Sequence, residues 1–177
     1  EGMHHQDAMP EVPGPDALPS ERELLATLGD QIPPPIRAFL SSVRPIEMRP
    51  TDPRQVTTPA PREPGQSIWF RLVAPIADDP TLHRAILAYA SDFVLLGTST
   101  LPHGVSWLTH DMQTASLDHA LWLHEPFRVD EWLLYTTDSP WAGHARGMNR
   151  GSIFTQDGRL VASVAQEGLI RKRAPRG

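Results

Sequence analysis

Strand patterns occupy most of the chain from residue 43 onward. Residues 43–48 and 66–73 predict two strands at the start of this region, the second with alternating Ile68, Phe70 and Leu72. Four further strand-like runs follow toward the C-terminus, at about 113–124, 131–140, 144–156 and 159–171. The last two runs are separated by Asp157-Gly158, a pair that favours the tight turn of a β-hairpin. These patterns predict an antiparallel meander.

A single helix pattern separates the first two strands from the other four. Asp79 and Pro80 favour a helix start, because Asp caps the first turn and Pro needs no donor there. Apolar residues then recur at helical spacing until Gly97, which predicts one long helix. The stripe expected to face the sheet consists of Leu82, Ile86, Tyr89, Phe93 and Leu96. One antiparallel sheet wrapped around one central helix is the α+β layout called the hotdog, although other α+β folds also place one helix beside a meander.

Proline sets the first part of the chain apart. Thirteen of the 19 prolines lie in the first 66 residues, which is typical of an extended linker. Ser20 and Glu23 form a capping-box pattern before a leucine-rich turn, so a short helix is expected over about 21–29. A second short helix is expected over 35–41, since Pro is tolerated in a first helical turn. The expected organisation is a Pro-rich interdomain linker over 1–42, a folded domain over 43–173 and a tail over 174–177.

Gln166 is the most informative polar residue of the predicted strands. Side chains alternate between the two faces of a strand, so Gln166 shares a face with Ala162, Val164 and Ile170. A side-chain amide on such a face costs free energy unless something binds it. The amide can both donate and accept, which suits holding a water molecule or a carbonyl oxygen. Either Gln166 belongs to a functional site, or nearby backbone groups satisfy it.

Composition narrows the classes of function. The 177 residues carry a formal net charge of −5 and are 40% hydrophobic, which fits a soluble globular domain. The absence of Cys excludes a disulfide-rich scaffold and thiolate metal ligands. No apolar run approaches the length expected of a membrane span. An acidic chain without a recognition motif also argues against nucleic-acid binding.

Basic residues gather at the C-terminal end of the chain. Residues 140–177 hold seven Arg and Lys against two acidic residues, while residues 67–139 hold three against nine. Such a cluster could meet a polyanionic ligand such as a nucleotide phosphate, or it could simply be solvated. The candidate substrate-binding residues on this basis are Arg146, Arg150, Arg171 and Arg173.

Several short runs of residues carry a family resemblance. They include Ala88-Tyr-Ala-Ser-Asp92, Ser116-Leu-Asp-His119, Trp122-Leu-His-Glu-Pro-Phe127, Asp130-Glu-Trp-Leu-Leu-Tyr135 and Gln166-Glu-Gly168. In their order over about 43–172, they closely resemble the type II (TesB-like) acyl-CoA thioesterases. The resemblance implies the C-terminal half of a double-hotdog enzyme. It also implies hydrolysis of fatty acyl-CoA to free fatty acid and CoA, with CoA as part of the substrate and no separate cofactor.

The resemblance also implies a catalytic group. In that family the group is an Asp near the end of the central helix, a Thr or Ser opening the following strand, and a Gln on the last strand. Carried over residue by residue, these are Asp92, Ser116 and Gln166. Ser at position 116, where relatives commonly have Thr, keeps the hydroxyl but loses a methyl group that restricts the rotamer. Asp92 would then take a proton from a water molecule that Ser116 and Gln166 orient.

Two alternatives and a metal site are also considered. Asp118 and His119 could form the dyad of a hotdog hydratase or dehydratase, but adjacent residues of one strand face opposite sides. The chain could instead be an acyl-CoA-binding or structural half without activity of its own. No metal site is expected, because His103, His119 and His124 lie 16 and 5 residues apart, which fits no common ligand spacing.

The resemblance further implies partners and a location. The substrate would be acyl-CoA, and the edge strand of a hotdog sheet would pair with the N-terminal hotdog half of the same protein or with a second copy of this chain. The chain begins at Glu1 rather than Met, as expected for part of a longer protein. A cytoplasmic protein without a membrane span is expected.

Overall fold

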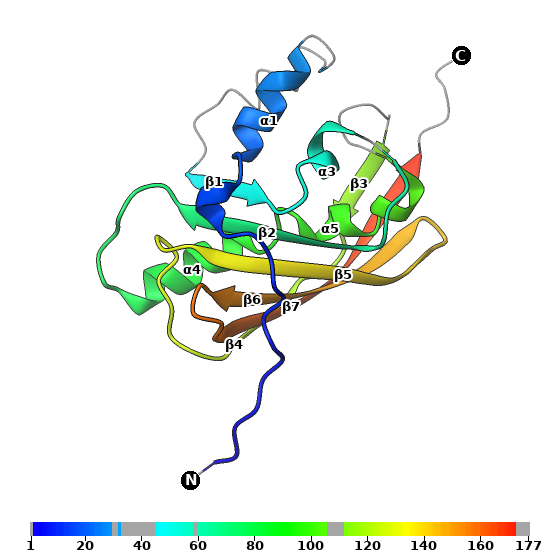
Figure 1. Cartoon of the computed structure of the whole chain (residues 1–177). Coiled ribbons are helices and arrows are strands. Elements are labelled where there is room, and N and C mark those ends of the chain that lie inside the picture. The colour runs from blue at the N-terminus through cyan, green and yellow to red at the C-terminus, as the bar shows by residue number, and fades with distance from the viewer. Residues whose placement is uncertain (1, 30–31, 33–44, 59, 106–111, 173–177) are drawn as a thin grey trace.

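An antiparallel sheet curls around one helix, as the strand and helix patterns predict (Figure 1). A computed structural model describes residues 2–29, 32, 45–58, 60–105 and 112–172. The strands are β1 (Ile46–Pro50), β2 (Gly65–Leu72), β3 (Met112–Ser116), β4 (Ala120–Leu123), β5 (Leu133–Gly143), β6 (Arg146–Thr155) and β7 (Leu160–Lys172). The helices are α1 (Glu21–Leu28), α3 (Arg54–Thr57), α4 (Pro80–Ala90) and α5 (Leu95–Thr98), with 3-10 turns η1 (Pro15–Ala17) and η3 (Leu101–His103). The predicted α+β layout is confirmed.

The strand order of the sheet is β1-β2-β5-β6-β7-β3, and all neighbours are antiparallel. β3 and β4 both pair with β7, one after the other along it, so together they form the last edge of the sheet. β5, β6 and β7 make the predicted meander. β1 continues to Pro50, past the end of the predicted strand over 43–48, and residues 43–44 of that prediction lie outside the described residues.

The two hairpins of the meander turn in different ways. Gly158 has a φ of 89°, so the predicted Asp157-Gly158 turn relies on the conformational freedom of glycine. Between β5 and β6, His144 and Ala145 have φ angles of 51° and 60°, left-handed values that glycine, Asn and Asp adopt more easily. The alternation over 144–156 predicts a strand instead. That prediction is wrong for its first two residues, because neither residue type signals a turn.

The single strand predicted over 113–124 is also wrong, since β3 and β4 are separated by residues 117–119. At this break, the Asp118 carboxylate accepts a hydrogen bond of 2.7 Å from the N–H of Glu167 in β7. The side chain takes the place of the backbone carbonyl that a regular ladder would offer. The chain therefore leaves the ladder, and His119 turns toward Gln166 rather than continuing a strand.

The long helix predicted up to Gly97 is divided in two. A turn over residues 91–94 follows α4 and leads into α5. Ser91 Oγ donates to the carbonyl of Ala88 at 2.9 Å, and the buried Tyr135 hydroxyl donates to the carbonyl of Ser91 at 2.9 Å. Such bonds satisfy carbonyl groups that a helix end leaves without partners. The position of the break depends on Tyr135, a residue from β5, so the helix pattern does not reveal it.

The face of α4 that packs on the sheet is not the predicted one. His83, Leu87 and Ala90 are buried at helical spacing. The exposed members of the predicted stripe are Leu82 (39%), Tyr89 (58%) and Phe93 (41%). Helix α4 carries apolar residues on more than one face, so its sequence does not decide which face packs on the sheet. The face that is buried also carries His83, a polar residue that argued against its burial. His83 Nδ1 accepts a hydrogen bond of 3.1 Å from the N–H of Val129, while its buried Nε2 has no partner among the described residues.

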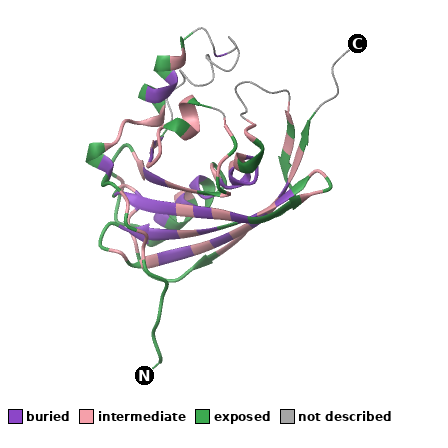
Figure 2. Ribbon diagram, turned by 45° about the vertical axis from the view of Figure 1, so that its right-hand side comes forward, coloured by how far each residue is buried: buried purple, intermediate pink, exposed green. Residues whose placement is uncertain are grey.

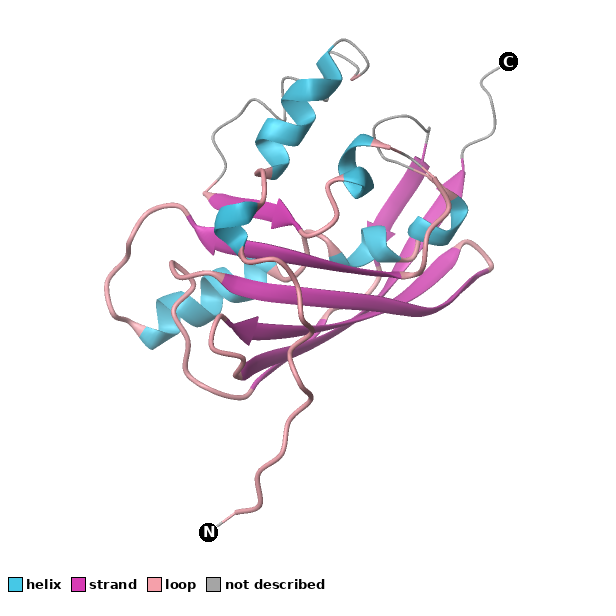
Figure 3. Ribbon diagram, in the orientation of Figure 1, coloured by secondary structure: helices cyan, strands magenta, loops and turns pink. Residues whose placement is uncertain are grey.

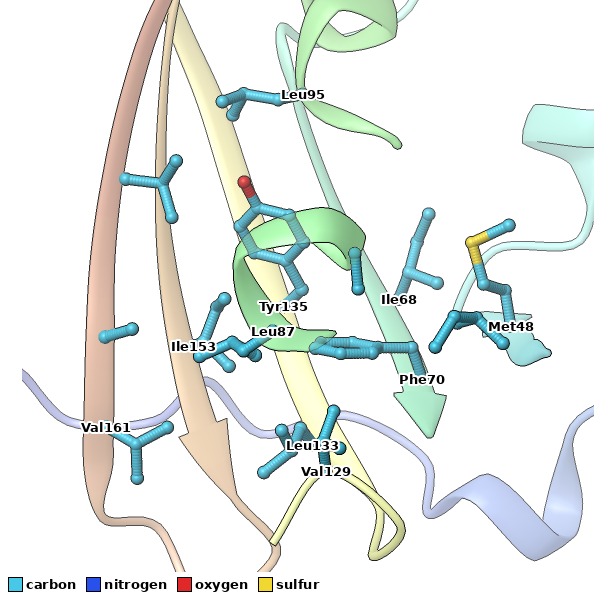
Figure 4. Packing of buried hydrophobic residues seen from close by; sticks show 14 residues of the cluster. Met48, Ile68, Phe70, Leu87, Leu95, Val129, Leu133, Tyr135, Ile153 and Val161 are labelled. Carbon is cyan, nitrogen blue, oxygen red and sulfur yellow. The ribbon is translucent and has the colours of Figure 1, made fainter. Parts of the chain in front are cut away.

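The core fills the space between α4 and the concave face of the sheet (Figure 4). Leu87 of α4 is fully buried against apolar residues of the middle strands, including Leu133 and Ile153. The rings of Tyr135 and Phe70 pack in a T-shaped arrangement with centroids 6.2 Å apart. Figure 2 shows the burial that results, with buried positions alternating with less buried ones along the strands. Aromatic and aliphatic burial of this kind is the main force that stabilises such a domain.

The Pro-rich N-terminal segment covers the opposite face of the sheet (Figure 3). The outer cluster consists of Trp69, Trp132, Leu134 and Phe154, and the residues packed on it are Met9, Val12, Leu18 and Leu160. Trp69 Nε1 donates to the carbonyl of Pro13 at 2.8 Å, and Gln6 bonds both Gly158 O and Leu160 N. An extended Pro-rich segment suits this role, because it leaves carbonyl groups free to accept from side chains.

Helix α1 confirms the predicted capping box. Glu23 N donates to Ser20 Oγ at 3.2 Å, and Ser20 N donates to Glu23 Oε2 at 2.8 Å. The predicted helix over 35–41 lies outside the described residues.

Residues 80–103 are long and apolar enough to cross a membrane by length and composition only. In the structure this segment is not one helix, since it contains α4, the 91–94 turn, α5 and η3. Its buried positions pack inside the curled sheet, and 44% of its most apolar window is buried. The composition is therefore explained by a central core helix.

Candidate active site

The three predicted catalytic residues lie together at the end of the central helix. Ser116 Oγ donates to Asp92 Oδ1 at 3.1 Å, and Gln166 Nε2 donates to the same oxygen. Asp92 is in the turn after α4, Ser116 ends β3, and Gln166 lies within β7. Gln166 is fully buried, whereas the Asp92 side chain is 52% exposed. One carboxylate oxygen is thus held by protein donors while the side chain remains open to solvent.

Close packing on β7 brings these elements together. Ser116 pairs across the β3–β7 ladder with Gly168, and Gly168 lies two residues after Gln166 in β7. A Cβ atom on Gly168 would overlap Cδ1 of Leu96, so α5 can lie directly on this strand only because the residue is glycine. Gln66 of β2 donates to the carbonyl of Val94 at 3.2 Å and holds the other end of the 91–94 turn.

His119 is a fourth member of the site, although from the sequence it was a candidate only as a partner of Asp118 in a dyad or as a metal ligand. Its Nδ1 lies 3.1 Å from Gln166 Nε2 and 3.8 Å from Asp92 Oδ1, and its Nε2 lies 2.8 Å from Ser91 Oγ. In the continuous strand expected over 113–124, residues 118 and 119 would simply face opposite sides of the sheet, so that prediction gave His119 no place in the site. Asp118 is turned away and bonds Glu167 N, so the two do not form a dyad.

Asn149 lies beside Gln166 on the neighbouring strand. The two residues are register partners in the β6–β7 ladder, and both are fully buried. Within the part of the chain that the structure describes, neither Asn149 Oδ1 nor Gln166 Oε1 receives a hydrogen bond. Buried acceptors of this kind usually have a donor, so the pair favours a bound water molecule or ligand N–H at this position. An alternation test like the one applied to Gln166 could have found Asn149, which shares a face with Gly147 and Gly151.

Tyr135 supports the turn that carries Asp92. Burial of the phenol, and then the negative charge of nearby Asp92, raise the pKa of Tyr135 far above its ordinary value. The hydroxyl therefore stays protonated and can donate to the carbonyl of Ser91, the residue before Asp92.

Comparisons with known proteins identify the family of this chain. A family model described as acyl-CoA thioesterase matches residues 44–169. The chain belongs to this family. Human acyl-coenzyme A thioesterase 8 is 39% identical over 176 residues, which cover 96% of this chain and 54% of that protein. Acyl-CoA thioesterase 2 of Haemophilus influenzae is 34% identical over 170 residues, which cover 96% of this chain and 59% of that protein.

Solved structures show the same relationship. Acyl-CoA thioesterase II TesB2 of Mycobacterium marinum is 41% identical with a TM-score of 0.73, and the match covers 99% of this chain and 60% of that one. A hot dog fold protein of unknown function from Alicyclobacillus acidocaldarius has a TM-score of 0.66 at 16% identity, which supports the hotdog fold. This member of the acyl-CoA thioesterase family thus spans little more than half the length of the relatives it matches.

The three described residues of the basic set predicted to bind substrate do not line the Asp92 site. By strand alternation, Arg146 and Arg150 face away from Asn149, and Arg171 faces away from Gln166. The Arg146 guanidinium pairs with Glu167 at 3.1 Å, and that of Arg150 pairs with Asp138 at 2.5 Å. Arg173 lies outside the described residues. The number of basic residues in a segment does not show which face of a strand they lie on, because neighbouring side chains of a strand point to opposite faces.

The histidines considered for a metal site have other surroundings. His119 belongs to the Asp92 site, and His124 Nε2 lies 2.9 Å from Ser163 Oγ. Among the described residues, no three His, Cys, Asp or Glu side chains gather in a way that could hold a metal ion.

Proposed function

We propose that this chain carries the catalytic site of an acyl-CoA thioesterase, which hydrolyses fatty acyl-CoA to free fatty acid and CoA by direct attack of water. The observation that supports this most is the carboxylate of Asp92. Its Oδ1 accepts two hydrogen bonds, from Ser116 and Gln166, while the side chain is half exposed. No described residue donates to Oδ2, so that oxygen can receive a proton from water.

The reaction needs only water and the thioester. Asp92 Oδ2 takes one proton as the water oxygen attacks the thioester carbonyl and forms a tetrahedral intermediate. The intermediate then breaks its C–S bond, and the CoA thiolate leaves and takes up the proton from Asp92. One water molecule and one acyl-CoA thus give one carboxylic acid and one CoA thiol, with no covalent acyl-enzyme and no cofactor.

Ser116 and Gln166 hold the base, in addition to the water-orienting role that the family resemblance implies. Both side chains donate a hydrogen bond to Asp92 Oδ1 and so fix the position of the base. Gln166 Oε1 is buried and receives no hydrogen bond from the described residues, so it is an acceptor available for the second proton of the same water. A water held by two acceptors in this way is oriented for attack.

Release of free thiol from palmitoyl-CoA tests this function. Asp92→Asn keeps the size of the side chain but removes the base, so kcat should fall by roughly 10²- to 10⁴-fold. Asp78→Asn is the matched control, because the Asp78 side chain is 89% exposed and pairs only with Arg128 among the described residues. An Asp92→Asn rate within about threefold of wild type would exclude the base role. Trapping of an acyl group on Ser116 would instead favour a covalent mechanism, and water addition to an enoyl-CoA would favour the hydratase alternative.

We further propose that an N-terminal hotdog half of the same protein covers the open side of this domain. The chain spans 54–60% of its relatives. Large apolar side chains are exposed on the central helix and along the β3–β4 edge, namely Leu82, Tyr89, Leu117, Trp122 and Leu123. The last strands of this edge also leave backbone groups for pairing. A second copy of this chain could occupy the same surface when that half is absent.

Light scattering on the purified chain, with and without a separately produced N-terminal half, tests this partner. The expected result is a dimer, or a one-to-one complex with higher thiol release than the chain by itself. A stable monomer of 19.6 kDa with full activity would contradict the two-half arrangement without affecting the catalytic assignment. The cytoplasmic location stays a prediction.

A further inference from the structure

A closed ring of hydrogen bonds surrounds the base of the proposed site. Asp92 Oδ1 contacts Gln166 Nε2, which lies 3.1 Å from His119 Nδ1. His119 Nε2 lies 2.8 Å from Ser91 Oγ, and Ser91 is joined to Asp92 by a peptide bond. The ring thus begins and ends at the same turn after α4.

The donors of this ring follow from the chemistry of its members. A carboxylate only accepts, so Gln166 must direct its NH₂ group, not its oxygen, at Asp92. The second proton of that NH₂ group points to His119 Nδ1, which must therefore be an unprotonated acceptor. The imidazole proton is then on Nε2 and is donated to Ser91 Oγ, whose own proton goes to the carbonyl of Ala88.

The same assignment determines where the amide oxygen of Gln166 points. Both protons of Nε2 are used within the ring, and Oε1 receives no hydrogen bond from the described residues. A flipped amide would bring Oε1 against the Asp92 carboxylate, and His119 would lose its donor. His119 is therefore the second of two contacts that hold the amide in a single orientation.

We propose that neutral His119, oriented by Ser91, is a positioning residue that fixes the Gln166 amide so that Oε1 faces the reacting water beside Asp92. This proposal rests on the proposed function. His119 acts through Gln166, because its Nδ1 is 3.8 Å from Asp92 Oδ1 and beyond hydrogen-bond distance. The side chain is 25% exposed, so its ring remains at the margin of the core.

Two substitutions at position 119 separate positioning from structural support. His119→Ala removes the acceptor for Gln166, and kcat should fall about 10-fold with KM changed less than about twofold. His119→Asn places an oxygen near the position of Nδ1, and should restore most of kcat. His124→Ala is the matched control, since it removes a His–Ser contact of 2.9 Å that touches neither Asp92 nor Gln166. A His119→Ala variant as active as His124→Ala, or an Asn variant no better than Ala, would overturn the proposal.

A measurement on the unmodified chain keeps the proposal testable if the variants fold poorly or if the chain shows no thioesterase activity. The nitrogen-15 NMR signals of the ring distinguish the two neutral forms of histidine. The proposal requires the proton of His119 on Nε2, with Nδ1 unprotonated. A proton on Nδ1 in the neutral ring would overturn it, whatever the enzyme hydrolyses. If this chain together with the N-terminal half releases no thiol, while His119 is in the Nε2 form, the result would contradict the proposed function and leave the ring supported.

Discussion

The hydroxyl of Tyr135 offers a sharp test of how the fold holds the active-site turn. Tyr135 is 2% exposed, and its hydroxyl donates at 2.9 Å to the carbonyl of Ser91, which is itself fully buried. Tyr135→Phe keeps the ring, its packing on Phe70 and the space beside Gly151, and removes only the donor. The change therefore isolates one hydrogen bond.

The expected cost follows from burial. Removing one partner of a buried hydrogen bond costs about 1–3 kcal/mol, because the remaining group is left without a partner. We expect the free energy of unfolding to fall by about 2 kcal/mol, which corresponds to a Tm lower by about 4–8 °C for a domain of this length. Because Ser91 precedes Asp92, loosening of the turn should also lower kcat, by about threefold or more.

Urea denaturation followed by circular dichroism measures the stability change, and thiol release measures the rate. Tyr89→Phe is the matched control, since Tyr89 is 58% exposed and its hydroxyl has no hydrogen bond to any described residue. That variant should remain within about 0.5 kcal/mol of wild type. If Tyr135→Phe unfolds at the same urea concentration as Tyr89→Phe, the hydroxyl does not support the turn and the reasoning is wrong.

Two further predictions concern stability elsewhere in the domain. Ala145→Gly should raise the free energy of unfolding by about 1 kcal/mol in urea denaturation, because Ala145 has a left-handed φ of 60°, which strains a residue with a Cβ atom. The control Ala142→Gly, in strand β5, should lower the free energy of unfolding, and equal effects of the two changes would contradict backbone strain at Ala145. Burial works to raise the pKa of Asp130, but hydrogen bonds from Arg128 and a backbone N–H outweigh it and hold the pKa below its ordinary value. The ionised Asp130 carboxylate should contribute its full stabilisation above about pH 4 and lose it as the pH falls through the lowered pKa of the folded state. The loss of stability in acid should therefore be smaller in Asp130→Asn, and an unchanged acid profile would count against this assignment.

Local patterns in the sequence predicted much of the scaffold. The capping box of Ser20 and Glu23, the Asp157-Gly158 turn and the strands of the meander depend on neighbouring residues, so local pattern reveals them. The family resemblance brought Asp92 and Gln166 to attention, and the structure shows them in contact. The burial of Gln166 was also expected, because its strand neighbours on one face are apolar.

Only the tertiary structure decided which surfaces meet. α4 is apolar on more than one side, so the burial of His83 and the exposure of Tyr89 depend on where the sheet lies. His119 reaches Gln166 because Asp118 replaces a backbone acceptor of β7 and breaks the strand. Such choices are set by contacts between residues far apart in the sequence, while hydrophobic periodicity reports only the local geometry of the backbone.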